Sequence, residues 1–196
     1  MGFDFKNDPF DNFLTLLKEA QLKGIPDHNA MALGTVNEKC EPSVRIVLYK
    51  GLIRGGFSFY TNYDGRKGHE LEKNKNAAAT FFWSHLDQQI RIEGAVEKLT
   101  AAESDIYFAS RPRLSQIGAW ASDQSEKIDS FDTFLHKVEA VEKKYHDQPV
   151  PRPPHWGGYH LLPKEIEFWF GHTGRLHERY VYQKNGDGWN RFLRSP

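Results

Sequence analysis

Short runs of alternating apolar and polar residues recur along the chain with only brief turns between them. The segment 43–50 shows the pattern well, with Val44, Ile46 and Leu48 on one face. Successive side chains of a strand point to opposite faces, so this alternation predicts strands. Strands that follow one another directly pair antiparallel. We therefore expect a mainly β fold with flanking helices, its antiparallel sheet closed or half-closed as a barrel.

The same periodicities place the other elements. Strands are predicted at residues 30–36, 43–50, 57–61, 76–83, 88–99, 156–162, 164–170, 178–184 and 189–193. Helices are predicted at residues 9–22, 65–74, 100–110, from Pro112 onwards, and 130–145. Asp8 before Pro9 is typical of a helix start, and Asn185-Gly-Asp-Gly188 is typical of a hairpin turn.

The helix 130–145 and the segment after it complete this outline. The apolar stripe of the helix, predicted to be buried, consists of Phe131, Phe134, Leu135, Val138 and Val141. The Pro-rich residues 149–154 predict a stiff extended connector, followed by the C-terminal strands of 156–196. At this length, residues 1–196 are expected to form one domain.

Charge and cysteine content restrict the partners and the compartment. The chain has 26 basic and 26 acidic residues, and this balance argues against nucleic acid or a membrane surface as the main partner. No apolar run approaches the roughly 20 residues needed to cross a bilayer. The single cysteine, Cys40, and the lack of a signal-peptide pattern predict a cytoplasmic protein.

Motifs of several enzyme classes are missing from the sequence. There is no Gly-x-Gly-x-x-Gly after a strand, no Walker loop and no Gly-x-Ser-x-Gly. The nine histidines show no metal-ligand spacing, so we expect no metal site. Any difficult chemistry on this scaffold is then expected to come from a cofactor.

The segment 107–125 concentrates hydrogen-bond donors. Tyr107, Arg111 and Ser115 recur every four residues, and Pro112 predicts a break between two helices. Such a corner would offer a hydroxyl, a guanidinium and free helix N-terminal amides to a phosphate monoester. From these residues alone, a solvated corner with surface arginines explains the pattern equally well.

Two further clusters favour an anionic ligand. Arg66 and Lys67 fall in the first turn of a predicted helix, where the helix dipole disfavours cations unless an anion lies between them. A tolerated surface pair is an equally good interpretation. The bend after the strand 164–170 gathers Arg175, His177 and Arg179, which packing does not explain. Together the clusters are typical of a site for a planar, phosphorylated molecule.

Four sequence blocks then stand in a fixed order along the chain. They are Arg45-Ile-Val-Leu-Tyr-Lys50; Phe59-Tyr-Thr-Asn62 with Arg66-Lys67; Ser110-Arg-Pro-Arg-Leu-Ser-Gln-Ile-Gly-Ala-Trp120; and Ile166-Glu-Phe-Trp169 with Arg175-Leu-His-Glu-Arg179. In this order they resemble the pyridoxine/pyridoxamine 5′-phosphate oxidase family, from about residue 8 to the C-terminus.

The resemblance implies an FMN-binding split β-barrel that acts as a homodimer with flavin at the subunit interface. It implies oxidation of pyridoxamine 5′-phosphate or pyridoxine 5′-phosphate to pyridoxal 5′-phosphate. In that reaction a hydride passes from substrate C4′ to FMN, and O2 re-oxidises the flavin to give H2O2.

Site residues follow from the matched positions. The resemblance implies that FMN is bound by Arg45, Ile46, Val47, Leu48, Tyr49, Lys50, Tyr60, Thr61, Arg66, Lys67, Gln89, Gln124, Ser125, Trp169 and Arg179, some of them from the other subunit. It implies that the substrate is bound by Lys50, Tyr107, Arg111, Ser115, Arg175, Leu176 and His177. Arg175 and His177 would be the catalytic pair beside the pyridine ring, orienting it and steadying charge as hydride leaves.

The chain departs from the family pattern at both ends. Seven residues precede Asp8, where the family usually carries a longer arm with Arg and Tyr, and the chain ends in Leu193-Arg194-Ser195-Pro196 rather than Arg-Leu-x-Pro. Both departures bear on substrate affinity more than on flavin binding. Two other readings stay open: a split-barrel flavoprotein with another substrate, and a non-catalytic carrier of FMN or pyridoxal phosphate.

Overall fold

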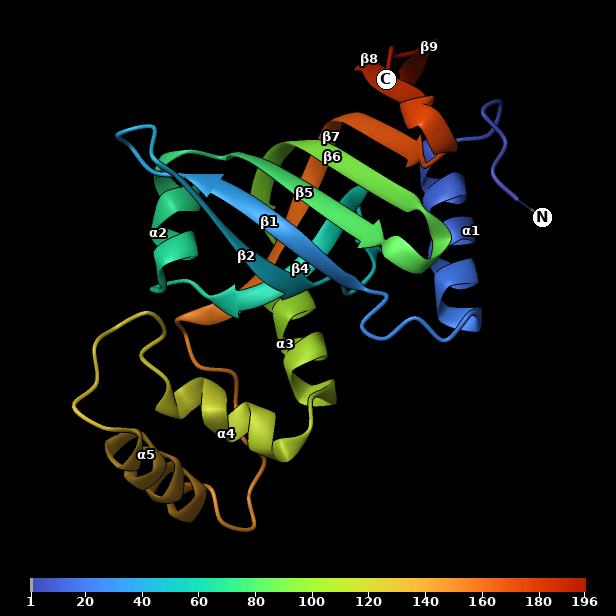
Figure 1. Cartoon of the computed structure of the whole chain (residues 1–196). Coiled ribbons are helices and arrows are strands. Elements are labelled where there is room, and N and C mark those ends of the chain that lie inside the picture. The colour runs from blue at the N-terminus through green and yellow to red at the C-terminus, as the bar shows by residue number, and fades with distance from the viewer. Residues whose placement is uncertain (1) are drawn as a thin grey trace.

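The computed structural model describes residues 2–196 as one large antiparallel sheet with helices around it (Figure 1). The strands are β1 (Ala30–Val36), β2 (Pro42–Leu48), β3 (Leu52–Ile53), β4 (Gly56–Asn62), β5 (Asn76–Trp83), β6 (Gln88–Lys98), β7 (Trp156–Phe170), β8 (Glu178–Asn185) and β9 (Gly188–Leu193). The helices are α1 (Pro9–Leu22), α2 (Arg66–Lys73), α3 (Ala101–Ser110), α4 (Arg113–Ala121) and α5 (Phe131–Lys144), with 3-10 turns at Ser84–Leu86 and Thr173–Arg175.

The sheet divides at β7, and this division confirms the predicted split barrel. The strand order is β2-β1-β5-β6-β7-β4-β3, and β8 also pairs with β7 and carries β9. The first part of β7 pairs with β4, as in Tyr60 opposite Gly158, and its last part pairs with β8, as in Trp169 opposite Arg179. The same edge of β7 therefore pairs with β4 in one half of the sheet and with β8 in the other.

The prediction of two strands at 156–162 and 164–170 was wrong, because β7 is continuous from Trp156 to Phe170. Pro163 suggested a break, since proline cannot donate to a sheet ladder. The structure accommodates it at a register shift between Glu93 and Gly94 of β6. A Cβ on Gly94 would lie 2.0 Å from the Leu162 carbonyl oxygen, so glycine lets the two backbones approach there.

Two apolar clusters hold the molecule together. The main one fills the barrel, where Phe13 of α1 packs edge-on against Phe57 with 4.8 Å between ring centroids. Asp8 caps α1 as predicted, its side chain accepting from the Phe10 amide at 2.8 Å. A smaller cluster joins α3 and α4 to the start of β7; it consists of Phe108, Ile117, Ala119, Val150 and Trp156.

The predicted buried side of α5 was also wrong. Phe131 is 66% exposed and Leu135 42% exposed, and no α5 side chain is fully buried. Only Val138 and Val141 pack against the smaller cluster, because α5 lies on α4 at the edge of the molecule and not on the sheet (Figure 1). None of the helices in residues 2–196 is long and apolar enough to span a membrane.

The outward face of β2 is apolar. Val44, Ile46 and Leu48 are 71%, 65% and 43% exposed, and Phe82 on β5 is 60% exposed. Ile46 pairs with Ala32, which pairs on its other side with Thr80, so the outward side chains of β2 and β5 lie on one surface. We call these four residues the apolar sheet face. Exposed apolar side chains gathered on one face of a sheet are typical of a protein–protein interface.

Candidate active site

A pocket of about 820 Å³ lies between β2, β4, α3 and α4. We call it the cationic pocket; its walls are Arg45, Ile46, Val47, Leu48, Lys50, Tyr60, Thr61, Lys67, Tyr107, Ser110, Arg111, Pro112, Ser115, Gln124 and Trp156. Four of these side chains are basic, and within the described part of the chain no wall residue is acidic. The pocket therefore suits an anionic ligand.

One end of the pocket is built around Lys67 at the start of α2. Its ammonium donates to Thr61 Oγ1 at 2.8 Å and to Gln124 Oε1 at 2.7 Å. Burial, together with the nearby Arg45, lowers the pKa of Lys67 to about 8. A cation held among neutral acceptors at a helix N-terminus is stabilised when an anion arrives.

Glu70 organises the other cations at this end. Its carboxylate is 4% exposed and pairs with Arg45 at 3.1 Å and with Arg66 at 2.8 Å. Burial alone would raise the pKa of Glu70, but hydrogen bonds from Thr35, Ser43, Arg66 and Arg45 outweigh it and lower the pKa to about 2. Glu70 thus stays ionised and fixes two arginines, whereas Lys67 keeps its charge free for a ligand.

The other end of the pocket is the corner between α3 and α4. Arg111 is the extended residue that ends α3, and Pro112 caps α4, which begins one residue later than predicted. The Arg111 guanidinium lies 4.5 Å over the Trp156 ring. Its Nη1 is shielded from solvent and has no hydrogen-bond partner within residues 2–196, and burial lowers the pKa of Arg111. A buried donor of this kind requires an acceptor from outside the chain.

Aromatic rings connect the two ends of the pocket. Tyr60 and Tyr107 stack at 3.8 Å between centroids, and the Lys50 ammonium lies 5.9 Å from the Tyr107 centroid. A Cβ on Gly158 would lie 2.7 Å from the Tyr60 ring, so that glycine makes room for it. The pocket thus combines flat apolar surfaces with separate cationic ends, an arrangement that suits planar phosphorylated ligands.

Three predicted residues of this region lie outside the pocket walls: Tyr49, Ser125 and Arg66, whose side chain pairs with Glu70 at the start of α2. Tyr49 is 6% exposed and packs in the core, edge-on to Phe13. Ser125 accepts a hydrogen bond from the Arg66 backbone amide at 3.2 Å and so fastens the loop after α4 to the start of α2.

The remaining predicted residues lie elsewhere on the sheet. Gln89, Trp169 and Arg179 stand opposite one another on β6, β7 and β8 and form one row across the sheet. Arg179 pairs with the buried Glu167 at 2.8 Å, and its Nη1 donates to the Ser195 carbonyl at 2.9 Å. Arg179 therefore belongs to this row and also anchors the C-terminal residues.

The loop after β7 carries the other three. His177 packs on Trp169 with 4.6 Å between ring centroids, and its Nδ1 accepts from the His172 backbone amide at 3.1 Å. Arg175 has a positive φ of 61°, next to Gly174 at 68°, and Leu176 is 73% exposed. We call these residues with the preceding row the distal set: Gln89, Trp169, Arg175, Leu176, His177 and Arg179.

The cationic pocket and the distal set lie at opposite ends of β7. Trp156 begins the strand and Trp169 stands next to its end, so about 40 Å of extended chain separates them. Figure 1 shows β7 running from the helices α3 and α4 to the hairpin of β8 and β9. Within one chain, the predicted site is therefore divided into two parts.

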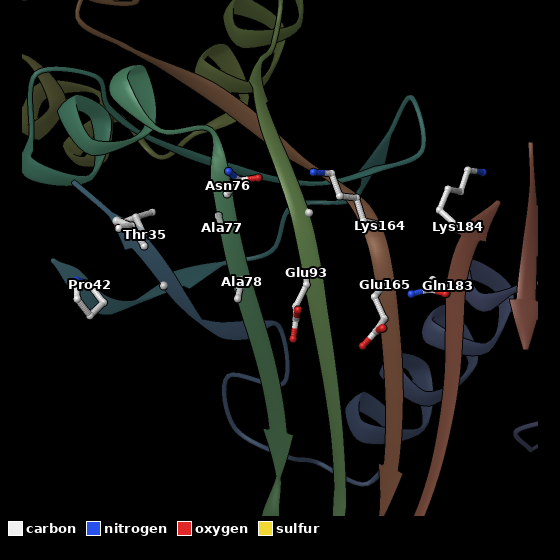
Figure 2. A pocket seen from close by; sticks show the side chains of 13 residues that line it. Thr35, Pro42, Asn76, Ala77, Ala78, Glu93, Lys164, Glu165, Gln183 and Lys184 are labelled. Carbon is white, nitrogen blue, oxygen red and sulfur yellow. The ribbon is translucent and has the colours of Figure 1, made fainter. Parts of the chain in front are cut away.

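A second hollow crosses the outer side of the sheet. This groove of about 900 Å³ spans β1, β5, β6, β7 and β8, and none of the predicted site residues lines it. Figure 2 shows the Glu93 and Glu165 side chains extending in one direction and the Lys164 and Lys184 chains lying toward the other end. The groove is lined by acidic and basic side chains together with small residues such as Ala78, so it lacks the cationic character of the cationic pocket.

Sequence reasoning missed some residues of the site. Trp156, Ser110 and Pro112 line the cationic pocket, and Glu70 arranges its arginines, yet none was predicted as a site residue. The Arg111–Trp156 contact joins positions 45 residues apart, so no local pattern reveals it. An acidic residue four positions after Arg66 on one helix did offer a signal for Glu70.

Comparisons with known sequences match two successive parts of the chain. Residues 17–145 match the family described as pyridoxamine 5′-phosphate oxidase, and residues 156–196 match the pyridoxine 5′-phosphate oxidase C-terminal dimerisation region. A pyridoxine/pyridoxamine 5′-phosphate oxidase of Bdellovibrio bacteriovorus is 56% identical over 195 residues, covering 99% of this chain and 100% of that one. The enzyme of the same name from Burkholderia lata is 51% identical over 184 residues, covering 94% and 86%.

Solved structures show the same architecture. PhzG from Burkholderia lata, crystallised with tetrahydrophenazine-1-carboxylic acid, superposes with a TM-score of 0.93 at 26% identity and covers 100% of this chain and 98% of its own. An FMN-binding protein from Nostoc punctiforme, related to pyridoxamine 5′-phosphate oxidase, has a TM-score of 0.77 at 13% identity, covering 97% and 99%, and shows the fold alone. With the sequence relatives, these findings show that the chain belongs to the pyridoxamine 5′-phosphate oxidase family.

Proposed function

We propose that this protein oxidises pyridoxamine 5′-phosphate and pyridoxine 5′-phosphate to pyridoxal 5′-phosphate with FMN as cofactor. One observation carries the proposal: the cationic pocket has two separate ends, each with a cation that lacks a carboxylate partner. Lys67 is held by neutral acceptors at one end, and the Arg111 Nη1 is shielded and unpaired, among the described residues, at the other. Two phosphorylated molecules match two such ends.

The residues at the Lys67 end fit the phosphate of FMN. Lys67 and Arg66 at the start of α2 would hold it, with Arg45 fixed beside them by Glu70. The residues of β2 from Arg45 to Leu48, with Lys50 just beyond the end of the strand, would line the flavin along one wall of the pocket. When bound, FMN accepts a hydride from the substrate, and O2 re-oxidises it with release of H2O2.

The residues at the Arg111 end fit the phosphate of the substrate. Arg111 offers a planar fork of donors, Lys50 adds a second charge, and Tyr107 and Ser115 add hydroxyl groups on the same wall. These contacts would fix the position of the substrate, so that C4′ faces the flavin. Positioning of this kind accounts for a large part of many enzymatic rate enhancements.

The distal set would complete the site from a second copy of the chain. Residues 156–196 match a dimerisation region, and the apolar sheet face offers a surface for a partner. Arg175 and His177 of one copy would then border the pyridine ring bound to the other. Their part is to orient the ring and to stabilise charge as C4′ loses hydride. Pyridoxine phosphate yields the aldehyde directly, whereas pyridoxamine phosphate yields an imine that water hydrolyses with release of ammonia.

PhzG supports a second candidate, a flavin-dependent oxidation of a different substrate. Its structure is closely similar, and the compound in its crystal is a tricyclic carboxylic acid. The four residues at the Arg111 end favour the phosphorylated vitamers, because a single carboxylate would not need two cations and two hydroxyls.

An anaerobic titration tests these alternatives. The purified protein is checked for a flavin spectrum and then mixed with pyridoxamine 5′-phosphate, unphosphorylated pyridoxamine or tetrahydrophenazine-1-carboxylic acid without oxygen. We expect bleaching only with the phosphorylated vitamer, reversed when air is admitted. Bleaching only with the tricyclic acid would establish the second candidate. A yellow protein that no compound bleaches would make it a carrier and overturn the proposal.

A further inference from the structure

Trp156 occupies an unusual position next to the cationic pocket. It is 6% exposed, it opens β7, and it is a wall residue of the pocket. Its ring is nearly parallel to those of Tyr60 and Tyr107, with interplanar angles of 13° and 5°. The Arg111 guanidinium lies 4.5 Å over the same ring.

The surroundings hold Trp156 in this place. Its carbonyl accepts from Arg152 Nη1 at 2.6 Å, and Arg152 Nε donates to Asp105 of α3 at 2.6 Å. Phe108, also on α3, meets the indole edge-on at 5.1 Å between centroids. The Pro-rich connector and the start of β7 are thereby fastened to the helix that ends in Arg111.

The contact has a chemical consequence for Arg111. A guanidinium above an aromatic face is attracted by the ring electrons and keeps the N–H groups in its plane free to donate. An acidic partner would hold Arg111 equally well but would neutralise it and compete with a ligand. The aromatic face orients the cation without using its donors, and this accounts for a shielded Nη1 that has no partner within the described chain.

We propose that Trp156 is a positioning residue for phosphate recognition: it holds Arg111 in the orientation that binds the substrate phosphate. The inference rests on the proposed function in taking that phosphate as the ligand. The competing explanation is that Trp156 is only a core residue of the smaller apolar cluster. The two explanations differ in whether the effect of replacing Trp156 on phosphate binding depends on Arg111.

A double-mutant cycle on the FMN-loaded protein separates them. The variants are Trp156→Leu, Trp156→Phe, Arg111→Ala and the double variant Arg111→Ala/Trp156→Leu. Trp120→Leu serves as the control, because Trp120 lies under Lys144 at 5.2 Å, a similar pair that does not line the cationic pocket. Flavin content is measured for each variant, with KM and kcat for pyridoxamine 5′-phosphate.

We expect Trp156→Leu to raise KM about tenfold, as for a desolvated cation–ring contact, with kcat within about threefold of the unaltered protein. Trp156→Phe keeps an aromatic face and should stay within about threefold in KM. In the Arg111→Ala background, Trp156→Leu should change KM less than about twofold. The Trp120 control should leave KM within about twofold.

Three outcomes would overturn the inference. They are a tenfold effect of Trp156→Leu that persists without Arg111, a Phe variant as impaired as the Leu variant, and an equal effect of Trp120→Leu. The dissociation constant of inorganic phosphate, measured by calorimetry on the same holoproteins, gives a readout that needs no turnover. If the protein oxidises no vitamer but phosphate binding shows the same pattern across the cycle, the proposed function fails and the role of Trp156 stands.

Discussion

Arg111 and Arg113 are two residues apart at the same helix start, yet the fold uses them differently. Arg113 donates to the backbone carbonyls of Gln148 and Tyr145, at 2.9 and 2.6 Å, and fastens the chain after α5. Arg111 keeps a shielded donor inside the cationic pocket. Arg113 thus has a structural role, whereas the role proposed for Arg111 is to bind a ligand.

This contrast leads to the first prediction. Arg111→Ala should raise the KM for pyridoxamine 5′-phosphate by about ten- to a hundredfold, because it removes charge-assisted hydrogen bonds to phosphate. Flavin content should stay nearly unchanged, since the FMN phosphate is assigned to the Lys67 end. Arg113→Ala is the matched control and should leave KM within about twofold. Loss of flavin in parallel with the rise in KM would contradict the division of the pocket into two ends.

Lys67 gives a prediction about pH. Burial and the nearby Arg45 lower its pKa to about 8, so the empty pocket loses this charge as the pH rises through that value. A bound phosphate favours the ammonium form and raises the pKa, so FMN binding is coupled to proton uptake above pH 8. The FMN dissociation constant should therefore rise from pH 7.5 to 9.5 by up to about tenfold per unit, and flavin fluorescence measures it.

The matched variants make this prediction specific. Lys67→Met should bind FMN more weakly at every pH and lose the dependence above pH 8. Lys73→Met, at the exposed end of the same helix, should keep both the affinity and the dependence. An unchanged slope in the Lys67 variant would assign the titration to another group.

At the scale of elements, Glu70 joins helix α2 to the strands β1 and β2. Its carboxylate accepts from Thr35 of β1 and, at 2.7 Å, from Ser43 of β2, besides pairing with Arg45 and Arg66. One buried side chain therefore fixes the helix start that the pocket depends on. A buried ion pair is costly to break, because removing one charge leaves the other uncompensated.

Glu70→Gln should lower stability at neutral pH. The folded pKa of about 2 lies below the ordinary value of 4.5, so ionised Glu70 stabilises the fold fully above about pH 5, and the contribution is lost as the pH falls toward 2. The shift corresponds to on the order of 3 kcal/mol. Urea unfolding should show a lower midpoint for the variant at pH 7 and a smaller difference at pH 3. Glu72→Gln, at an exposed position of α2, should leave the midpoint unchanged at both values.

Local chemistry was enough to predict some elements but not others. The α3–α4 corner followed from Pro112 alone, because proline restricts the residue before it. The continuity of β7 could not be predicted in this way, because Pro163 is accommodated by a register shift on the neighbouring strand β6. Leu135 fits a helical apolar stripe, yet whether a stripe is buried depends on which elements lie beside it.

At the scale of the whole molecule, local sequence patterns likewise do not show how the parts of the site are arranged in space. The sequence predicts which residues belong to the site, because four blocks of residues resemble those of one family in the same order. It does not show that Arg111 and Arg175 lie at opposite ends of a long strand, because that follows from the course of β7 through both halves of the sheet. We propose that a complete site requires two chains, so that in a symmetric dimer each chain would contribute its pocket to one site and its distal set to the other.

This arrangement can be tested by complementation between two impaired variants. Arg111→Ala damages the cationic pocket and Arg175→Ala damages the distal set. In a mixed dimer, one site would carry both substitutions and the other neither, because the intact pocket of one chain meets the intact distal set of its partner. Co-expression should form mixed dimers as about half of the total, with one intact site in each, and should restore about a quarter of the unaltered activity.

The subunits can carry different affinity tags, so that the mixed dimer is isolated and assayed alone, where about half of the unaltered activity is expected. The doubly substituted chain, Arg111→Ala/Arg175→Ala, paired with an unaltered chain provides the matched control. There each site contains one damaged part, and activity should stay near that of the impaired variants. If the singly substituted pair shows no gain but this control does, each site is built within one chain, and the two ends of β7 would have to approach one another by a rearrangement of the fold.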